Sequence, residues 1–466
     1  MDNPPAECLA PAVPDAPASH AEQLAIFQAV LKTIQHFFGG LAALLADVSD
    51  PRDQRYVRYP LPALACAGVL LFLCHLGSRR QINHLLRGNA AVAAKFRALF
   101  GVASCPHGDT LNVLCQELVP EQLQAAVSNA TARLIRQKVL YPYRLRGHCY
   151  VVGIDGTGTL AFAQRHCEHC LTVTQQGQTR YYHKVLEAKL LAPNGFALSL
   201  MTEFIENPGP NPDKQDCEQK GFTRLSESLH RRFPRLPLCL SLDALYATGP
   251  TFARCAEYHW KYLVVLKDKD LPKVCREFEA LCALSPGEHL EVVSGPHGAV
   301  QQSYRWANDI GYEDSTRRVH TLSVIECRET KPGTDGQPHT TVFKWVTNFK
   351  VKAKNVQELA NHGGRIRWKE ENEGFNTQKH GGFALEHAYS LDENAGKILY
   401  FLLQLAHLLE QLVAHGSLLR QAFPNGVGSV KNIAYRLLEA WRNLELQAAE
   451  LDRILHSRCQ IRFDSS

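Results

Sequence analysis

The chain has 466 residues, of which 45% are hydrophobic and 21% are charged, and its formal net charge is +5. This composition is that of an ordinary folded protein, and it excludes a disordered tail and a coiled coil. The length exceeds the size at which a single hydrophobic core usually stops growing, so two or three domains are expected. The net charge is too small to indicate a nucleic-acid partner by itself.

Residues 1–20 are rich in Pro and Ala and predict a disordered leader. They lack the basic start and the apolar centre of a signal peptide. The fifteen cysteines are scattered along the chain and form no compact framework. We therefore expect free thiols and a reducing compartment, the cytoplasm.

Residues 21–145 predict a helical N-terminal domain, because apolar residues recur at helical spacing from Leu24 to Leu44. The most apolar run, 61–77, is shorter than the roughly 20 residues of a membrane-spanning helix and contains His75. A buried core helix is favoured there over a transmembrane one. Residues 78–101 are similar to a DNA-binding helix pair, although a surface pair without a partner explains them as well.

After residue 145 the pattern changes to short β-rich runs that alternate with helical ones. We expect strands at 148–158, 181–193, 195–205, 238–244 and 261–268, and helices at 213–233 and 248–260. This order predicts a mixed α/β fold with helices packed on a sheet.

Four further β-like runs between 286 and 348 predict a β-rich insertion. A helix, a Gly-Gly break and a second helix follow, so the core domain comprises 146–285 and 349–395. Residues 396–466 predict a C-terminal helical region.

Two aspartates stand at strand ends: Asp155 in VVGIDGTGTL and Asp243 in LCLSLDALYA. A downstream glutamate, Glu371, lies in RIRWKEENEGFNTQK. Strand ends are where ligands bind in open α/β folds, although an aspartate there often only caps a turn. Jointly, three carboxylates favour a site for two Mg²⁺ or Mn²⁺ ions, because two-metal phosphoryl transfer needs several hard oxygen ligands.

Basic residues gather around the third carboxylate, as they would on a phosphate-contacting surface or on an ordinary solvated face. They are Lys344, Lys350, Lys352, Lys354, Arg365, Arg367, Lys369 and Lys379.

These segments resemble the catalytic triad of bacterial insertion-sequence DDE transposases. The resemblance covers the chain from about Asp50 to the end of the glutamate helix, and YYHK, TEFIEN and NEGFNTQK share it. It implies a ribonuclease-H-like mixed sheet with flanking helices and a β-rich insertion. It also implies metal-dependent DNA cleavage and strand transfer, with two metal ions held by Asp155, Asp243 and Glu371.

The family also carries a pattern of tyrosine, arginine, glutamate and lysine, which falls here on Arg367, Glu371 and Lys379. The tyrosine position is Gly364, and Lys379 lies one residue further from Glu371 than is usual. This shift makes Glu373 an alternative metal ligand, and Glu370 stays open as well. Glu371 is favoured because it keeps the RW-x-x-E spacing.

The resemblance further implies DNA contacts from Arg365, Arg367, Lys369, Lys379 and an aromatic of the insertion. In relatives such an aromatic stacks on a flipped base when a hairpin end forms. Trp306 is the first candidate and Trp345 the second, against the alternative of a core aromatic on a strand.

The partners implied are the double-stranded DNA ends of a mobile element and a target DNA, with a homodimer joining the two ends at the nucleoid and no membrane. Two alternatives stay open. One is a DNA-binding protein of transposase descent without catalysis, and the other is a metal-dependent DNA nuclease.

A separate motif, RHCEHC, places Cys167 and Cys170 at CxxC spacing. A zinc site completed by one of His166, His169, His183 or Cys217 is one interpretation, with Cys167, Cys170 and His183 as its core. Free thiols on a turn between two strands are the other.

Overall fold

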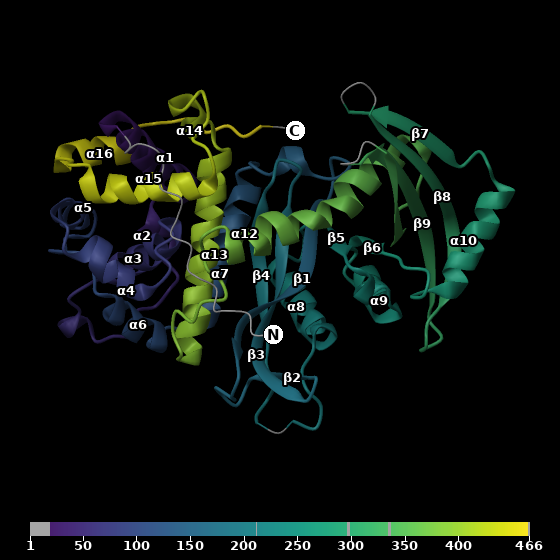
Figure 1. Ribbon diagram of the computed structural model, residues 1–466, viewed down its shortest axis with the longest axis horizontal. Coiled ribbons are helices and arrows are strands. Elements are labelled where there is room, and N and C mark those ends of the chain that lie inside the picture. The colour runs from purple at the N-terminus through teal and green to yellow at the C-terminus, as the bar shows by residue number, and fades with distance from the viewer. Residues whose placement is uncertain (1–18, 211, 296–298, 334–336, 465–466) are drawn as a thin grey trace.

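The computed structural model describes residues 19–210, 212–295, 299–333 and 337–464. The predicted leader therefore lies, apart from its last two residues, outside the described residues. The described chain is a mixed α/β structure with a ten-stranded sheet flanked by helices, which confirms the predicted fold class at that level (Figure 1).

The N-terminal region is helical, as predicted. Its first helix begins with a capping box between Ser19 and Glu22 and ends at Gly39, whose φ of 71° is left-handed. The helices are α1 (His20–Phe38), α2 (Leu41–Leu44), α3 (Leu61–Leu73), α4 (Arg79–Gln81), α5 (Ala90–Phe100), α6 (Gly108–Glu117) and α7 (Pro120–Arg136). Helix α3 is buried along nearly its whole length, as expected of a core helix.

The C-terminal helices pack against the N-terminal ones, so the two ends of the chain form one helical body (Figure 1). They are α13 (Glu393–His415), α14 (Ser417–Ala422), α15 (Val430–Asn443) and α16 (Ala448–His456). Phe27 of α1 meets Trp441 of α15 edge-on, with ring centroids 5.3 Å apart. The buried Lys95 ammonium donates to the carbonyl of Trp441 at 3.0 Å, near the end of α15 where carbonyls are free. The helical regions predicted at 21–145 and 396–466 are thus two halves of one packing unit.

Helix α13 is long and apolar enough to cross a membrane by length and composition. However, 89% of its most apolar window is buried inside the protein, between the helical body and the sheet. Burial of this kind is typical of a central core helix.

The sheet has the strand order β2-β3-β1-β5-β6-β10-β9-β8-β7, with β4 paired to β3. Its strands are β1 (Tyr150–Phe162), β2 (Leu171–Gln175), β3 (Gln178–Leu191), β4 (Ala197–Ile205), β5 (Leu238–Leu242), β6 (Lys261–Val265), β7 (His289–Ser294), β8 (Val300–Glu313), β9 (Val319–Pro332) and β10 (Pro338–Thr347). The β1–β5 and β5–β6 pairs are parallel, and the other pairs are antiparallel. Helices α8 (Glu218–Arg232), α9 (Gly249–Glu257) and α10 (Pro272–Leu284) connect successive strands.

The segment predicted as a β-rich insertion forms β7 to β10, and these strands continue the same sheet. β10 pairs with β6 through Trp345 opposite Val265 and Thr347 opposite Leu263. The hydrogen-bonded ladder therefore runs without a break from the strands that carry the aspartates into the insertion.

The segment that follows β10 crosses the sheet as a succession of helical turns (Figure 1). These are α11 (Ala353–Glu358), a π-helical turn (Leu359–Gly364), a 3₁₀ turn (Arg365–Arg367), a second π-helical turn (Glu370–Asn376) and α12 (Thr377–His380). The predicted Gly-Gly break at 363–364 is wrong, because helical turns continue through it. The two glycines instead allow contact with the sheet, since a Cβ on Gly363 would lie 2.5 Å from Leu263 Cδ1.

A buried carboxylate, Glu187 on β3, ties the sheet to α13. It accepts hydrogen bonds from the hydroxyls of Ser199, Thr202 and Tyr400, and it lies 3.8 Å from the ammonium of Lys189. Both charged side chains are fully buried. Removing one member of such a pair leaves the other charge buried without compensation.

We expect Glu187→Ala to lower the free energy of unfolding by about 3–5 kcal/mol, because Lys189 loses its closest carboxylate. Tyr400→Phe removes one donor but keeps the ion pair, so it should cost about 1 kcal/mol. Chemical denaturation of the two variants measures both values. Equal losses would show that the ion pair adds nothing to the hydrogen bond.

Candidate active site

The two predicted aspartates lie at the same level on neighbouring parallel strands. β1 pairs with β5 through Gly153 opposite Ser241. Asp155 is two residues after Gly153, and Asp243 is two residues after Ser241, just beyond the end of β5. Adjacent strands are about 4.8 Å apart, so the register brings the two carboxylates together on one face.

Glu370 completes this cluster. Its side chain is fully buried, and neither carboxylate oxygen has a hydrogen-bond partner. It lies against Gly153, where a Cβ would come within 2.2 Å of Glu370 Oε2. Burial raises the pKa of Glu370 well above its ordinary value, and the negative charge of Asp155 raises it further, while Lys189 opposes the shift.

Asp155 is held from two sides. One oxygen accepts the Gly156 N–H at 2.8 Å, and the other lies 3.2 Å from the guanidinium of Arg367. Burial raises the pKa of Asp155, and the carboxylates of Glu218 and Asp243 add to the shift, whereas Arg367 lowers it. Arg367, which the resemblance predicts to grip phosphate, is therefore paired with a carboxylate of the cluster.

Asp243 also serves as a local cap. Its carboxylate accepts the N–H of Leu245 at the start of the 3₁₀ turn Ala244–Tyr246. Asp243 can therefore cap the turn and belong to the carboxylate cluster at the same time, because the cap uses only one of its two oxygens.

A fourth carboxylate, Glu218, borders the cluster and was missed in the sequence. It is the first residue of α8, it pairs with Lys184 of β3, and it accepts the Tyr246 hydroxyl at 3.3 Å. A Cβ on Gly156 would lie 2.8 Å from its Cδ and 2.8 Å from its Oε1. Gly156, directly after Asp155, was the available signal in the sequence, because a residue without a side chain leaves room for a neighbouring group such as the Glu218 carboxylate.

The two glutamates favoured from the sequence lie elsewhere. Glu371 is exposed, and the half-buried Glu373 pairs with Lys369 at 3.1 Å. The structure brings Glu370 to Asp155 in place of Glu371. Successive side chains on a helical turn point in different directions, and here Glu370 faces the sheet while Glu371 faces outward.

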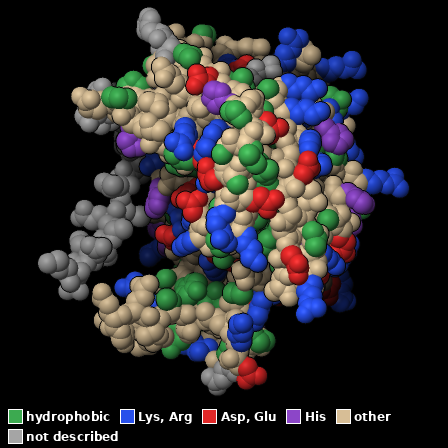
Figure 2. Space-filling model, turned by 90° about the vertical axis from the view of Figure 1, so that its right-hand side faces the viewer, with side chains coloured by type: hydrophobic (Ala, Val, Ile, Leu, Met, Phe, Trp, Pro, Cys, Tyr) green, Lys and Arg blue, Asp and Glu red, His purple; other side chains and the backbone are tan. Residues whose placement is uncertain are grey.

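Most of the basic residues around this segment have carboxylate partners in the protein. Lys344 lies among Asp268, Glu279 and Glu326, and the other pairs are Lys350–Asp309, Arg365–Glu329, Arg367–Asp155, Lys369–Glu373 and Lys379–Glu386. Lys352 and Lys354 are exposed. Figure 2 accordingly shows Lys and Arg side chains with Asp and Glu side chains between them on the face it presents. Arg365 in particular contacts both β9 and β10, since it pairs with Glu329 of β9 and its Cζ lies 4.7 Å from the ring centroid of Phe343 on β10.

Trp306 and Trp345 are core residues, exposed by only 4% and 2%. Neither ring is available for stacking on a base, because both pack into the apolar cluster beneath the insertion strands. Trp345 fills the space beside Gly364, where a Cβ would lie 2.5 Å from its ring, so the glycine in the tyrosine position is required by packing. Trp368, next to Arg367, is 60% exposed.

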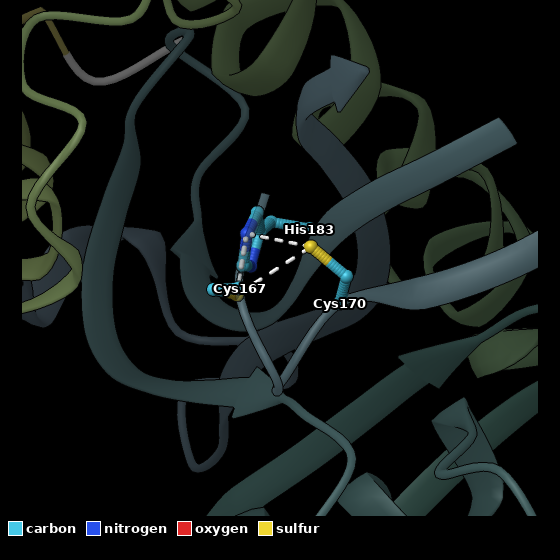
Figure 3. Close-up of side chains that lie close together, drawn as sticks. All are labelled: Cys167, Cys170 and His183. Atoms are coloured by element: carbon cyan, nitrogen blue, oxygen red, sulfur yellow. Dashed lines mark hydrogen bonds between the residues drawn. The ribbon is translucent and has the colours of Figure 1, made fainter. Parts of the chain in front are cut away.

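The thiol groups of Cys167 and Cys170 and the imidazole of His183, a residue of β3, lie close together as a separate group (Figure 3). His169 and Cys217 are not part of this group. His169 bonds the carbonyl of Asn207 at 2.8 Å, and Cys217 is exposed at the start of α8. No disulfide joins any of the cysteines in the described ranges.

The carboxylate cluster fits a hard divalent cation. Glu370 keeps two buried oxygens without a hydrogen-bond partner, the charge of Asp243 raises the pKa of Asp155, and the charge of Asp155 raises the pKa of Glu370. Carboxylate oxygens are the ligands that Mg²⁺ prefers, and a cation would remove the repulsion among them. Asp155, Asp243 and Glu370 would hold it, with Glu218 at the border.

Residues 42–130, within the N-terminal helical region, match a family model described as DDE_Tnp_1-associated. No curated protein matches the chain. The family-model match points to the DDE transposases, and it does so through a region separate from the carboxylates described above.

We expect Glu370→Gln to stabilise the metal-free protein at pH 7.5. Because the folded state raises the pKa of Glu370, stability declines as the pH rises above the ordinary value of 4.5. The neutral amide removes this penalty, which is on the order of 1 kcal/mol per unit of pKa shift. The gain, measured by denaturation in a chelator, should vanish at about pH 4, where the carboxyl is protonated in both states.

Glu371→Gln is the matched control, because the side chain of Glu371 is exposed. It should leave stability unchanged at both pH values. Added Mg²⁺ should stabilise the wild type and the Glu371 variant more than the Glu370 variant. If Glu371→Gln stabilised the protein and Glu370→Gln did not, the assignment of Glu370 to the cluster would be wrong.

Gly153→Ala should displace the Glu370 carboxylate, because the new methyl group would overlap Oε2. We expect weaker stabilisation by Mg²⁺ in thermal unfolding, together with a loss of stability of about 1–3 kcal/mol from overpacking. Gly158→Ala on the same strand is the control, since its Cβ would meet nothing closer than 3.9 Å. Equal responses of the two variants to Mg²⁺ would contradict this account.

Proposed function

We propose that the chain is a DDE transposase that cleaves DNA at the ends of a mobile element and joins the freed 3′ ends to a target. Its catalytic carboxylates are Asp155, Asp243 and Glu370, on a core of the ribonuclease-H-like type. The observation that carries this proposal is the pair of buried, unpartnered oxygens of Glu370 beside Asp155. The family-model match at residues 42–130 supports it independently.

The three carboxylates would hold two Mg²⁺ or Mn²⁺ ions, which when bound activate the attacking oxygen and stabilise the leaving one. The protein's own contribution is positional. The β1–β5 register fixes the two aspartates, and the helical turns over the sheet press Glu370 onto Gly153. Burial of Glu370 also keeps bulk water from its oxygens, which strengthens their attraction for a cation.

Arg367 would change partners on DNA binding. Its guanidinium faces Asp155 at 3.2 Å and is 17% exposed. The guanidinium would then pair with a phosphate next to the scissile bond in place of Asp155, in the planar two-pronged manner of arginine. The exposed ring of Trp368 and the exposed Lys352 and Lys354 are further DNA contacts on the same segment.

The reaction sets the partners. Double-stranded ends of the element and a target duplex are the substrates, and two copies of the chain would hold two ends together. Such a protein acts at the nucleoid in the cytoplasm.

Asp155→Asn and Glu370→Gln should each lower Mg²⁺-dependent cleavage roughly 10²-fold or more, since each removes a charge that holds the cations. The substrate is DNA carrying the repeats that flank the chain's own coding sequence, and the readout is cleavage and strand transfer on a gel. Binding to the same DNA, measured by mobility shift, should stay within a few-fold.

Glu371→Gln and Glu373→Gln are the matched controls and should retain cleavage. Loss of activity in Glu371→Gln with full activity in Glu370→Gln would overturn the assignment of the third carboxylate. Cutting without joining by the wild type would indicate a nuclease, and binding with neither step would indicate a DNA-binding protein without catalysis.

A further inference from the structure

A second cluster of metal-binding side chains lies outside the carboxylate site. The Sγ atoms of Cys167 and Cys170 are 3.4 Å apart, and each lies 3.5 Å from Nε2 of His183 (Figure 3). The three ligand atoms thus form a nearly equilateral triangle. Two thiols and one imidazole are a combination found in tetrahedral zinc sites.

The spacing fits one ion at the centre of the group. With zinc–sulfur bonds of about 2.3 Å, the edge of a tetrahedron is about 3.8 Å, close to the three separations observed. A disulfide would need the sulfurs about 2.05 Å apart, so the separation of 3.4 Å is that of two sulfurs without a bond between them. Cys170 is moreover fully buried, although it stands in a connecting segment.

The surrounding hydrogen bonds fix the loop that carries the two thiols. The side-chain amide of Asn207 donates to the Cys170 carbonyl at 2.8 Å, and its backbone N–H donates to the His169 carbonyl at 3.1 Å. His183 is held by the ladder of β3, in register with Leu160 of β1. The ligands are therefore positioned by groups that do not themselves compete for a metal ion.

We propose that Cys167, Cys170 and His183 bind a structural Zn²⁺ ion and that Glu393 supplies its fourth ligand. Glu393, at the start of α13, lines the same cavity as His183, and its carboxylate lies 3.7 Å from Nε2 of the neighbouring His169. His166 is less suited, because its Nε2 already bonds the Leu391 carbonyl at 2.7 Å.

The ion would join three elements that are distant in sequence: the loop between β1 and β2, strand β3 and the start of α13. His183 is four residues before Glu187, which faces Asp155 across the β1–β3 ladder. At about 3.3 Å per residue, the zinc lies roughly 13 Å from the carboxylate cluster. Its role is structural: it would hold the β2–β3 hairpin in place beside β1, the strand that carries Asp155, and it would take no part in the chemistry of the carboxylate cluster.

Metal analysis of the full chain, purified without a histidine tag, tests the proposal. We expect near-stoichiometric zinc in the wild type and none in the Cys167→Ser/Cys170→Ser double variant. The exposed Cys217 provides a matched control, so Cys217→Ser should keep its zinc. Wild type free of zinc and unable to bind it on titration, or a double variant that retains it, would overturn the site.

Two further measurements use the wild type alone, so they test the site even if the double variant does not fold. Cobalt exchanged into the wild type should show thiolate charge-transfer absorption and the visible bands of a tetrahedral ion, whereas a spectrum without thiolate bands would overturn the ligand set. Chelation of the wild type should expose residues 163–183 to proteolysis, and added zinc should restore protection. If chelation left the rate of proteolysis unchanged, the bracing role would be contradicted.

Glu393→Gln tests the fourth ligand separately. It should weaken zinc affinity about 10-fold or more while leaving the cobalt–thiolate bands in place. An unchanged affinity would remove Glu393 from the shell. None of these readouts involves DNA, so they stand apart from the test of strand cleavage.

Discussion

The close approach of carboxylates to Asp155 depends on the two glycines that flank it on β1. Gly153 leaves the space that Glu370 enters, and Gly156 leaves the space occupied by Glu218 and by the stem of Lys184. A side chain at either position would overlap the neighbouring carboxylate. The strand is thus built to bring negative charges within reach of one another, and the helical turns after β10 are pressed onto the sheet for the same purpose.

Such a cluster costs free energy unless cations compensate it. The protein's own cations near the cluster are Arg367 beside Asp155, Lys184 beside Glu218 and the buried Lys189 near Glu370. These cations compensate only in part, since Glu370 keeps two oxygens without partners. A carboxylate cluster that is only partly neutralised has the chemistry of a divalent-cation site.

The scaffold holds this arrangement from both sides. On one side, α13 reaches the buried Glu187 through the Tyr400 hydroxyl, at 2.6 Å, and carries the helical body formed by both chain ends. On the other side, β10 extends the ladder of β6 into the strands after residue 286, and Trp345 meets Gly364 there. The segment that bears Glu370 therefore packs on this one continuous sheet, from Trp345 of β10 at Gly364 to Gly153 of β1 at Glu370.

The sequence alone determined what is local. Periodicity predicted the strands that carry Asp155 and Asp243 and the helices at both ends, and the short CxxC spacing placed Cys167 near Cys170. Tertiary structure decided which side chains face each other. The motif spacing favoured Glu371, yet the orientation of successive helical residues on the sheet turns Glu370 inward. Trp306 is buried because the insertion strands share the main sheet, a long-range pairing that no local pattern records.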